Sequence, residues 1–148
     1  MISFTVYGEP VAQGRPRAGT VNGKARLYDP KKSRDYKQYV KLVASEYRPK
    51  SLLKGPLELI VRIYKPSLKS FSKKKAAAAE QGLLRPTSKP DADNYVKAIK
   101  DGLNKVIWHD DSQVVDLHVS KFYSEIPRVE IQIKPLSQEE EQLCLSLI

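Results

Sequence analysis

The sequence predicts a single α/β domain of the α+β kind, in which a small, mixed four-stranded sheet packs with two or three helices. Its 148 residues fit one domain, and 41% of them are hydrophobic, which is enough for one buried core. Four segments alternate apolar and polar side chains, as half-buried strands do. Two further segments space their apolar residues as helices do, so helices and strands are expected to share one core.

The N-terminal half is expected to contain two strands, a loop and a helix. Apolar and polar residues alternate over residues 2–7 and again over 57–63, as in strands with one buried face. Glycine and proline recur between residues 8 and 30, which predicts a loop. The apolar residues of 35–47 fall at helical spacing, and Ser33 is the candidate N-cap of that helix.

The C-terminal half begins with an apparent insertion. Residues 67–89 hold a lysine run and an alanine-rich stretch that could form a short helix. A stronger helix is expected over about 94–106. Two strands follow, at 115–119 and 129–133, and their short connection predicts an antiparallel hairpin. His118 falls on the polar phase of the first of these strands and is expected to be exposed.

The composition excludes several classes of protein. A single cysteine, Cys144, leaves no internal disulfide framework or cysteine-rich zinc site and suits a reducing compartment. The first residues lack the basic segment and apolar run of a secretory signal. No stretch approaches the ~18 apolar residues that a membrane span needs. We expect one soluble domain over residues 1–136, with 67–89 as a basic insertion, and a C-terminal tail over 137–148.

The charge changes sign along the chain, although the formal net charge is +9. Residues 1–90 contain 20 Lys and Arg against 6 Asp and Glu, whereas residues 91–148 contain 6 against 11. A basic surface favours a polyanionic partner, because each phosphate that it neutralises releases counterions. Surface charge kept for solubility would explain the total but predicts no such segregation.

The acidic part contains two short clusters of carboxylates. Asp91 and Asp93 lie just before the stronger helix, and in extended backbone that spacing points both side chains the same way. Asp110 and Asp111 follow the helix, in the turn that leads to the third strand. Converging carboxylates repel one another unless a cation lies between them, and oxygen ligands suit Mg²⁺ or Mn²⁺. In phosphodiester hydrolysis such ions activate water and stabilise the leaving oxygen.

Each of these acids also has a structural explanation. An Asp before a helix is most often an N-cap. Asp110 and Asp111 precede Ser112 in an ordinary turn composition. Lys97 lies four residues after Asp93, where the two can form a helix salt bridge. Taken singly, these explanations are the better ones, but taken together they weigh about evenly with a catalytic site.

The residues around the acids resemble a known family. Lys89 to Asn104 reads KPDADNYVKAIKDGLN, and Trp108 to Val115 reads WHDDSQVV. This pattern, Asp-x-Asp-Asn-x-x-Lys, then a helix and an Asp-Asp-x-Gln-Val box, resembles the RusA family of Holliday-junction resolvases. The resemblance is specific over about residues 89–123.

The resemblance implies roles for individual residues. It implies that Asp91, Asp93 and Asp111 hold Mg²⁺, with Mn²⁺ as an alternative ion, and that Lys97 is the catalytic lysine. By the same resemblance, Asp110 matches a neighbouring acid that is expected to be a secondary metal ligand. A fixed ammonium near the scissile phosphate can offset the charge that develops in the transition state. We expect Asn94 to orient the carboxylate of Asp93 or to cap the helix.

Contacts to the DNA backbone are expected from basic residues on both sides of the first helix, which position DNA without specifying its sequence. The candidates are Arg15, Arg17, Lys24, Arg26, Lys31, Lys32, Lys73, Lys74, Lys75 and Lys89. Tyr28, Phe71 and Trp108 are candidates to stack on bases, although packing is the better explanation of Trp108.

These expectations combine into a Mg²⁺-dependent endodeoxyribonuclease that resolves four-way DNA junctions in recombination, repair or prophage DNA processing. Cutting both strands needs two sites, so a homodimer is expected, located in the cytoplasm with the nucleoid. Two other classes stay open. One is a catalytically inactive module that binds junctions or single-stranded DNA, and the other is a basic adaptor that binds RNA or a protein.

Overall fold

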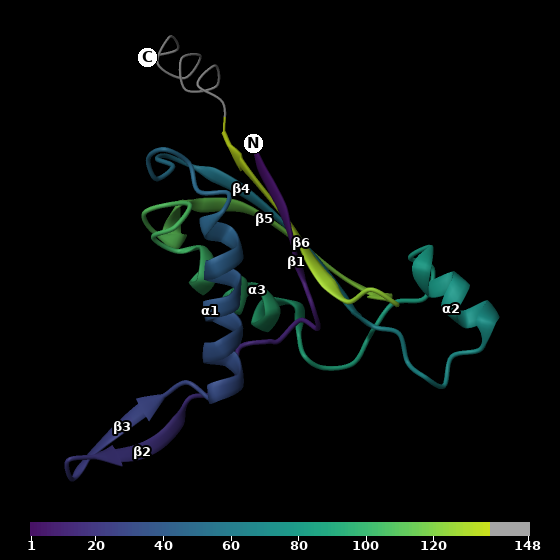
Figure 1. Ribbon diagram of the computed structural model, residues 1–148, viewed down its shortest axis with the longest axis horizontal. Helices are drawn as coiled ribbons and strands as arrows, with labels where there is room; N and C mark the ends of the chain where they lie inside the picture. The colour runs from purple at the N-terminus through teal and green to yellow at the C-terminus, as the bar shows by residue number, and fades with distance from the viewer. Residues whose placement is uncertain (137–148) are drawn as a thin grey trace.

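A mixed sheet of four strands in the order β1-β6-β4-β5 forms the centre of the fold (Figure 1). The computed structural model describes residues 1–136, so the expected tail over 137–148 lies outside the described residues. The strands are β1 (Ile2–Tyr7), β4 (Leu57–Pro66), β5 (Val114–Ser124) and β6 (Arg128–Pro135). β6 pairs antiparallel with β1 and β4, whereas β4 and β5 are parallel. The predicted fold class is confirmed.

The predicted hairpin of the last two strands is wrong, because β4 lies between β5 and β6. β4 occupies the centre because its inward side chains, Leu57, Leu59, Val61 and Ile63, are all fully buried. The connection over residues 125–127 has no Gly or Asn for a tight hairpin turn. It passes the end of β4 instead, and β6 then pairs with that strand.

Two helices, α1 (Lys31–Ser45) and α3 (Ala92–Leu103), cover one face of the sheet (Figure 1). They pack so closely that a Cβ on Gly102 would lie 2.7 Å from Cγ1 of Val40. α1 begins earlier than predicted, and Ser33 is not its N-cap. Ser33 is buried inside the first turn, where its hydroxyl accepts a hydrogen bond of 3.0 Å from the Gly14 N–H. It therefore ties the preceding segment to the helix.

A two-stranded ribbon, β2 (Arg17–Val21) and β3 (Lys24–Tyr28), replaces part of the predicted loop. The turn between the strands is made by Asn22 and Gly23, with φ of 53° and 74°. Asn-Gly is the pair that favours a two-residue hairpin turn, because both of its residues tolerate positive φ. The ribbon projects away from the sheet at the N-terminal end of α1 (Figure 1).

The insertion forms an arm that projects at the opposite end of the molecule from the ribbon (Figure 1). Its short helix, α2 (Lys73–Glu80), agrees with the alanine-rich stretch, and its N-cap is Ser72, whose side chain accepts from the Lys75 N–H. In the part of the chain that the structure describes, no helix is both long and apolar enough to cross a membrane.

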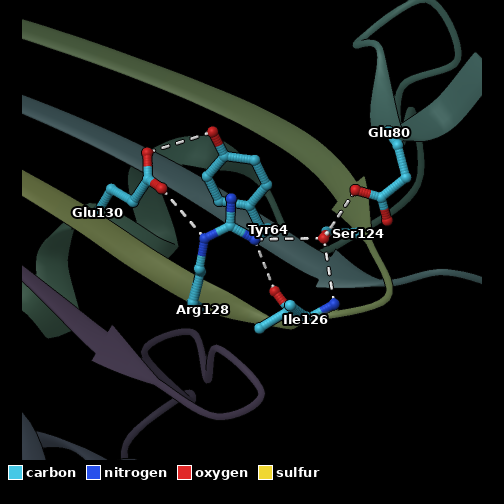
Figure 2. Close-up of polar contacts among 6 residues, drawn as sticks. All are labelled: Tyr64, Glu80, Ser124, Ile126, Arg128 and Glu130. Atoms are coloured by element: carbon cyan, nitrogen blue, oxygen red, sulfur yellow. Dashed lines mark hydrogen bonds and ion pairs between the residues drawn. The ribbon is translucent and has the colours of Figure 1, made fainter.

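The last residue of α2 anchors the arm to the end of the sheet. Figure 2 shows the carboxylate of Glu80 beside Ser124, whose hydroxyl donates to Oε2 at 3.1 Å. The backbone N–H of Glu125 donates to the other oxygen at 2.6 Å. Arg128 completes this cluster, because its guanidinium lies 3.8 Å from the ring centre of Tyr64 and donates to the Ser124 hydroxyl. The carboxylate of Glu80 thus ties the C-terminal end of α2 to the connection between β5 and β6.

Candidate active site

The start of α3 presents two carboxylates in different ways. Asp91 occupies the N-cap position, yet its side chain makes no capping hydrogen bond. Asp93 lies in the first turn of the helix. The expectation that both point the same way from extended backbone is wrong, because the helix begins at Ala92. Asp91 lines a pocket of about 630 Å³, and Asp93 lines a second one of about 320 Å³.

The smaller pocket brings together three of the predicted residues. Asp93 and Lys97 are four residues apart on α3 and so face the same side, and Asp111 reaches the same pocket from the turn before β5. Within residues 1–136, no ion pair joins Asp93 to Lys97. The salt-bridge explanation of Lys97 is therefore wrong, and its ammonium lines the pocket with the two carboxylates.

Asp111 is held by the one tryptophan. Trp108 is fully buried, and its indole N–H donates a hydrogen bond of 2.9 Å to Oδ1 of Asp111. The packing explanation of Trp108 is confirmed, and the ring is not free to stack on a base. Because a carboxylate has two oxygens that accept, this bond orients Asp111 and leaves Oδ2 available to the pocket.

Asp110 has the structural role that its turn composition predicted. Its carboxylate accepts hydrogen bonds from the backbone N–H and the hydroxyl of Ser112. The hydroxyl bond and then the backbone bond hold the pKa of Asp110 below its usual value. The side-chain oxygen of Gln113 in turn accepts a hydrogen bond from the Asp110 N–H. The two residues thereby form a capping box over the short helix Asp111–Gln113. Asp110 thereby positions the residue next to it.

Two lysines hold the segment that leads to Asp91. The ammonium of Lys121 donates to the carbonyl oxygens of Ser88 and Pro90, at 2.9 and 3.0 Å. Lys65 donates to the carbonyl oxygen of Lys89 at 3.2 Å. Burial, and then the nearby Lys121, lowers the pKa of Lys65. No local pattern in the sequence indicates either role, because each lysine contacts a carbonyl more than 20 residues away along the chain.

Basic side chains surround the larger pocket, next to Asp91. It is lined by Arg15, Lys32, Lys65 and Lys89, together with Asn94 and Tyr95 of α3. Lys31 lies exposed at the start of α1. The other predicted DNA contacts lie farther out: Lys24 and Arg26 are exposed on the ribbon, Lys73, Lys74 and Lys75 are exposed on α2, and the side chain of Arg17 is outside the described part. Phe71 packs edge-on against Tyr123.

The smaller pocket also contains an acid that the sequence analysis missed. Asp101 lines it and forms an ion pair with Lys37 of α1, with the Lys37 Nζ 2.9 Å from Oδ2 of Asp101. Lys37 also contacts Asp29 at 2.6 Å. Burial alone would lower the pKa of Lys37, but its hydrogen bonds to the two acids outweigh burial and raise it. This network joins α1, α3 and the base of the ribbon.

The donors present fit a hard divalent cation. Among residues 1–136, no three His, Cys, Asp or Glu side chains are close enough together to form a ready-made metal site. Asp93 and Asp111 nevertheless supply oxygen donors to one pocket, and Asp91 lies at the same helix end. Mg²⁺ typically takes only one or two carboxylates and completes its six ligands with water and substrate phosphate. An incomplete set of carboxylates is therefore what such an ion needs.

Comparison with known proteins gives a consistent result. The model of a family described as Endodeoxyribonuclease RusA matches residues 7–134. The "Uncharacterized protein YqaN" of Bacillus subtilis (strain 168) is 62% identical over 138 residues, which cover 92% of this chain and 97% of that protein. The "Crossover junction endodeoxyribonuclease rusA" of Lactococcus phage r1t is 30% identical over 133 residues, covering 88% and 93%.

Proposed function

This chain belongs to the RusA endodeoxyribonuclease family, and we propose that it is a Mg²⁺-dependent enzyme that cuts four-way DNA junctions. The observation that carries the proposal is the pocket in which Asp93, Lys97 and Asp111 meet. Asp93 and Lys97 of α3 and Asp111 of the turn before β5 converge there, and within residues 1–136 no ion pair joins the lysine to either acid. The 30% identity to a phage crossover junction endodeoxyribonuclease supports the same substrate.

Asp91, Asp93 and Asp111 are the residues that would hold the cation. When bound, Mg²⁺ supplies Lewis-acid stabilisation of the phosphate and lowers the pKa of water. Lys97 has a separate task, because an ammonium fixed in the pocket stabilises the negative charge that builds up on the phosphate oxygens. Trp108 orients Asp111 through its hydrogen bond to Oδ1. Asn94 supports the larger pocket, which it lines beside Asp91.

The basic residues would hold the DNA on both sides of the proposed active site. Arg15 and Lys89 line the larger pocket, next to Asp91. The ribbon and the α2 arm extend from opposite ends of the molecule (Figure 1). Their lysines and arginines can therefore contact different DNA branches of one junction. A homodimer would provide the second active site that paired cleavage requires.

The test is cleavage of a synthetic four-way junction beside a linear duplex of the same sequence, with Mg²⁺ or Mn²⁺. We expect wild type to cut the junction in preference to the duplex. Asp93→Asn should abolish cutting while junction binding persists, because the change removes a ligand and leaves the basic surface intact. Asp35→Asn is the matched control, since it makes the same chemical change on the exposed side of α1.

Three outcomes would contradict parts of the proposal. Junction binding without cleavage across both metals would favour the inactive binding module instead. Equal cleavage of duplex and junction would remove the junction specificity and keep the nuclease. Tight binding of RNA, with no preference for branched DNA and no cleavage, would favour the adaptor.

A further inference from the structure

α3 carries a lysine between two acids on the side that faces the smaller pocket. Asp93, Lys97 and Asp101 follow one another at intervals of four residues, and all three line the pocket. Side chains at that spacing are neighbours on a helix surface, so the ammonium of Lys97 can pair with either acid. Within residues 1–136, however, no ion pair joins Lys97 to Asp93 or to Asp101. The helix alone does not explain why Lys97 stays unpaired.

The carboxylate of Asp101 is already paired with a lysine of the neighbouring helix. Lys37 of α1 places its ammonium 2.9 Å from Oδ2 of Asp101. The side chain of Lys37 is only 18% exposed and that of Asp101 is 32% exposed, so solvent screens this ion pair less than a pair on an open helix surface. Lys97, by contrast, is exposed. Asp101 is therefore stabilised more by Lys37 than it would be by Lys97.

Two further contacts fix the position of Lys37. Its ammonium lies 2.6 Å from Oδ2 of Asp29, and the other oxygen of Asp29 accepts a hydrogen bond of 2.6 Å from Gln13. The backbone of Lys37 lies where the two helices meet, because a Cβ on Gly102 would be 3.2 Å from the Lys37 carbonyl oxygen. Burial would lower the pKa of Lys37, but the two acids raise it above its usual value, so the side chain stays charged.

We propose that Lys37 is a positioning residue, which pairs with Asp101 and thereby keeps the ammonium of Lys97 unpaired in the pocket. The role rests on the proposed function, in which Lys97 stabilises the charge on the phosphate oxygens. The pocket is lined by three carboxylates and by the ammonium groups of Lys97 and Lys100, so it is negative by one unit until Lys37 neutralises it. An uncompensated carboxylate of Asp101 would attract Lys97 and repel a phosphate, and both effects oppose cleavage.

The same contacts also allow a purely structural role, because they join α1 to α3 and to the base of the ribbon. Under the structural role, removing the charge of Asp101 in addition to Lys37 cannot restore cleavage, because the contact between the helices stays lost. Under the positioning role it restores cleavage, because no uncompensated carboxylate is left at this position to attract Lys97. The two roles therefore differ in the effect of a second substitution.

Cleavage of the four-way junction by a double variant tests the positioning role. We expect Lys37→Met to slow cleavage at saturating DNA by about tenfold, because one unpaired charge then acts on the pocket, and the double variant with Asp101→Asn to recover most of the rate. Lys37→Arg should cut as wild type does, because it keeps the charge. Asp29→Asn is the matched control at the wild-type rate, since it alters the other partner of Lys37 and leaves the pair with Asp101 intact. A folded double variant as slow as Lys37→Met, or a Lys37→Met that cuts at the wild-type rate, would overturn the proposal.

Metal affinity and the position of Lys97 test the proposal independently of cleavage. Thermal stability titrated with Mg²⁺ should show equal or tighter binding in Lys37→Met, because the change leaves the pocket more negative, and weaker binding would favour the structural role instead. A crystal structure of metal-free Lys37→Met should place the Nζ of Lys97 within about 4 Å of an Asp101 oxygen. A Lys97 that stays unpaired there would overturn the proposal. A wild type that never cuts fails only the proposed function, because the structure of the variant still decides whether Lys37 keeps Lys97 unpaired.

Discussion

The indole N–H of Trp108 donates a hydrogen bond to Oδ1 of Asp111 from a position where the ring is fully buried. A buried, rigid donor fixes the carboxylate at the edge of the pocket. Residues that orient metal ligands in this way typically contribute 10–100-fold, roughly, to metal affinity or activity. The bond therefore makes Trp108 a positioning residue for the proposed site.

Trp108→Phe should weaken metal binding and slow cleavage by about 10–100-fold, because it keeps most of the ring and removes the N–H. Titration of thermal stability with Mg²⁺ and Mn²⁺ measures the metal affinity separately from cleavage. A loss confined to stability, with unchanged metal affinity, would contradict the positioning role.

Lys121→Met should slow cleavage and leave the salt dependence of DNA binding unchanged. Lys121 donates to two carbonyl oxygens before Asp91, so its loss releases that segment without removing a phosphate contact. The measurement compares the slope of log binding constant against log salt concentration with the cleavage rate. A slope reduced by about one unit would show that the ammonium contacts DNA instead.

Lys24→Ala and Arg26→Ala should change the salt dependence of DNA binding and leave the cleavage rate unchanged. Both side chains are exposed on the ribbon, outside the two pockets. Each change is expected to weaken binding uniformly across sequences and to reduce the salt slope by about one. Cleavage at saturating enzyme should be unchanged. Thr20→Ala on the same ribbon is a control that removes no charge.

Gly102→Ala should destabilise the protein by about 1–3 kcal/mol, because the new Cβ would lie 2.7–2.8 Å from Val40 across the contact of α1 with α3. Urea unfolding measures the change. In the double variant with Val40→Ala the two losses should be less than additive, since the smaller side chain makes room. Gln38→Ala, on the exposed side of α1, should change stability little.

Acid should remove the contribution of Asp29 to stability. The hydrogen bond from Lys37 is the largest cause that holds the pKa of Asp29 below its usual 3.8 in the folded protein. A carboxyl with a depressed pKa stabilises the fold above its unfolded pKa, and this contribution is lost as the pH falls through the folded value. The stability difference between wild type and Asp29→Asn should therefore be constant near neutral pH and shrink below 3.8. A difference that is unchanged in acid would contradict this linkage.

Local patterns predicted much of the fold. Alternation identified β1 and β4, and helical spacing identified α1 and α3 to within a few residues. The ribbon was missed although its signal, Asn22-Gly23, is present, because the surrounding prolines and glycines favour a loop. The position of β4 between β5 and β6 depends on pairing between distant segments, which no local pattern encodes.

The candidate site was likewise predictable where its residues belong to a local motif, and unpredictable where they act through distant partners. Asp93, Lys97 and Asp111 were recognised from a motif, and the structure places them in one pocket. Asp101 and Lys121 act through partners more than 25 residues away, so their spacing carries no signal. Asp110 belongs to the turn as a cap, which turn composition alone had indicated.

The α2 arm leaves and rejoins the sheet at one place. Where it leaves, the Ser67 N–H donates to the Ser124 carbonyl at 3.0 Å, and where it returns, Lys121 holds the carbonyls of Ser88 and Pro90. Since both ends are fixed to the same strand, the length and sequence of the arm can change without moving β4, β5 or Asp91. The arm is thus the part of the chain in which relatives can diverge while the proposed catalytic residues keep their positions, and exchanging it between relatives is a direct way to transfer a DNA-binding preference from one protein to another.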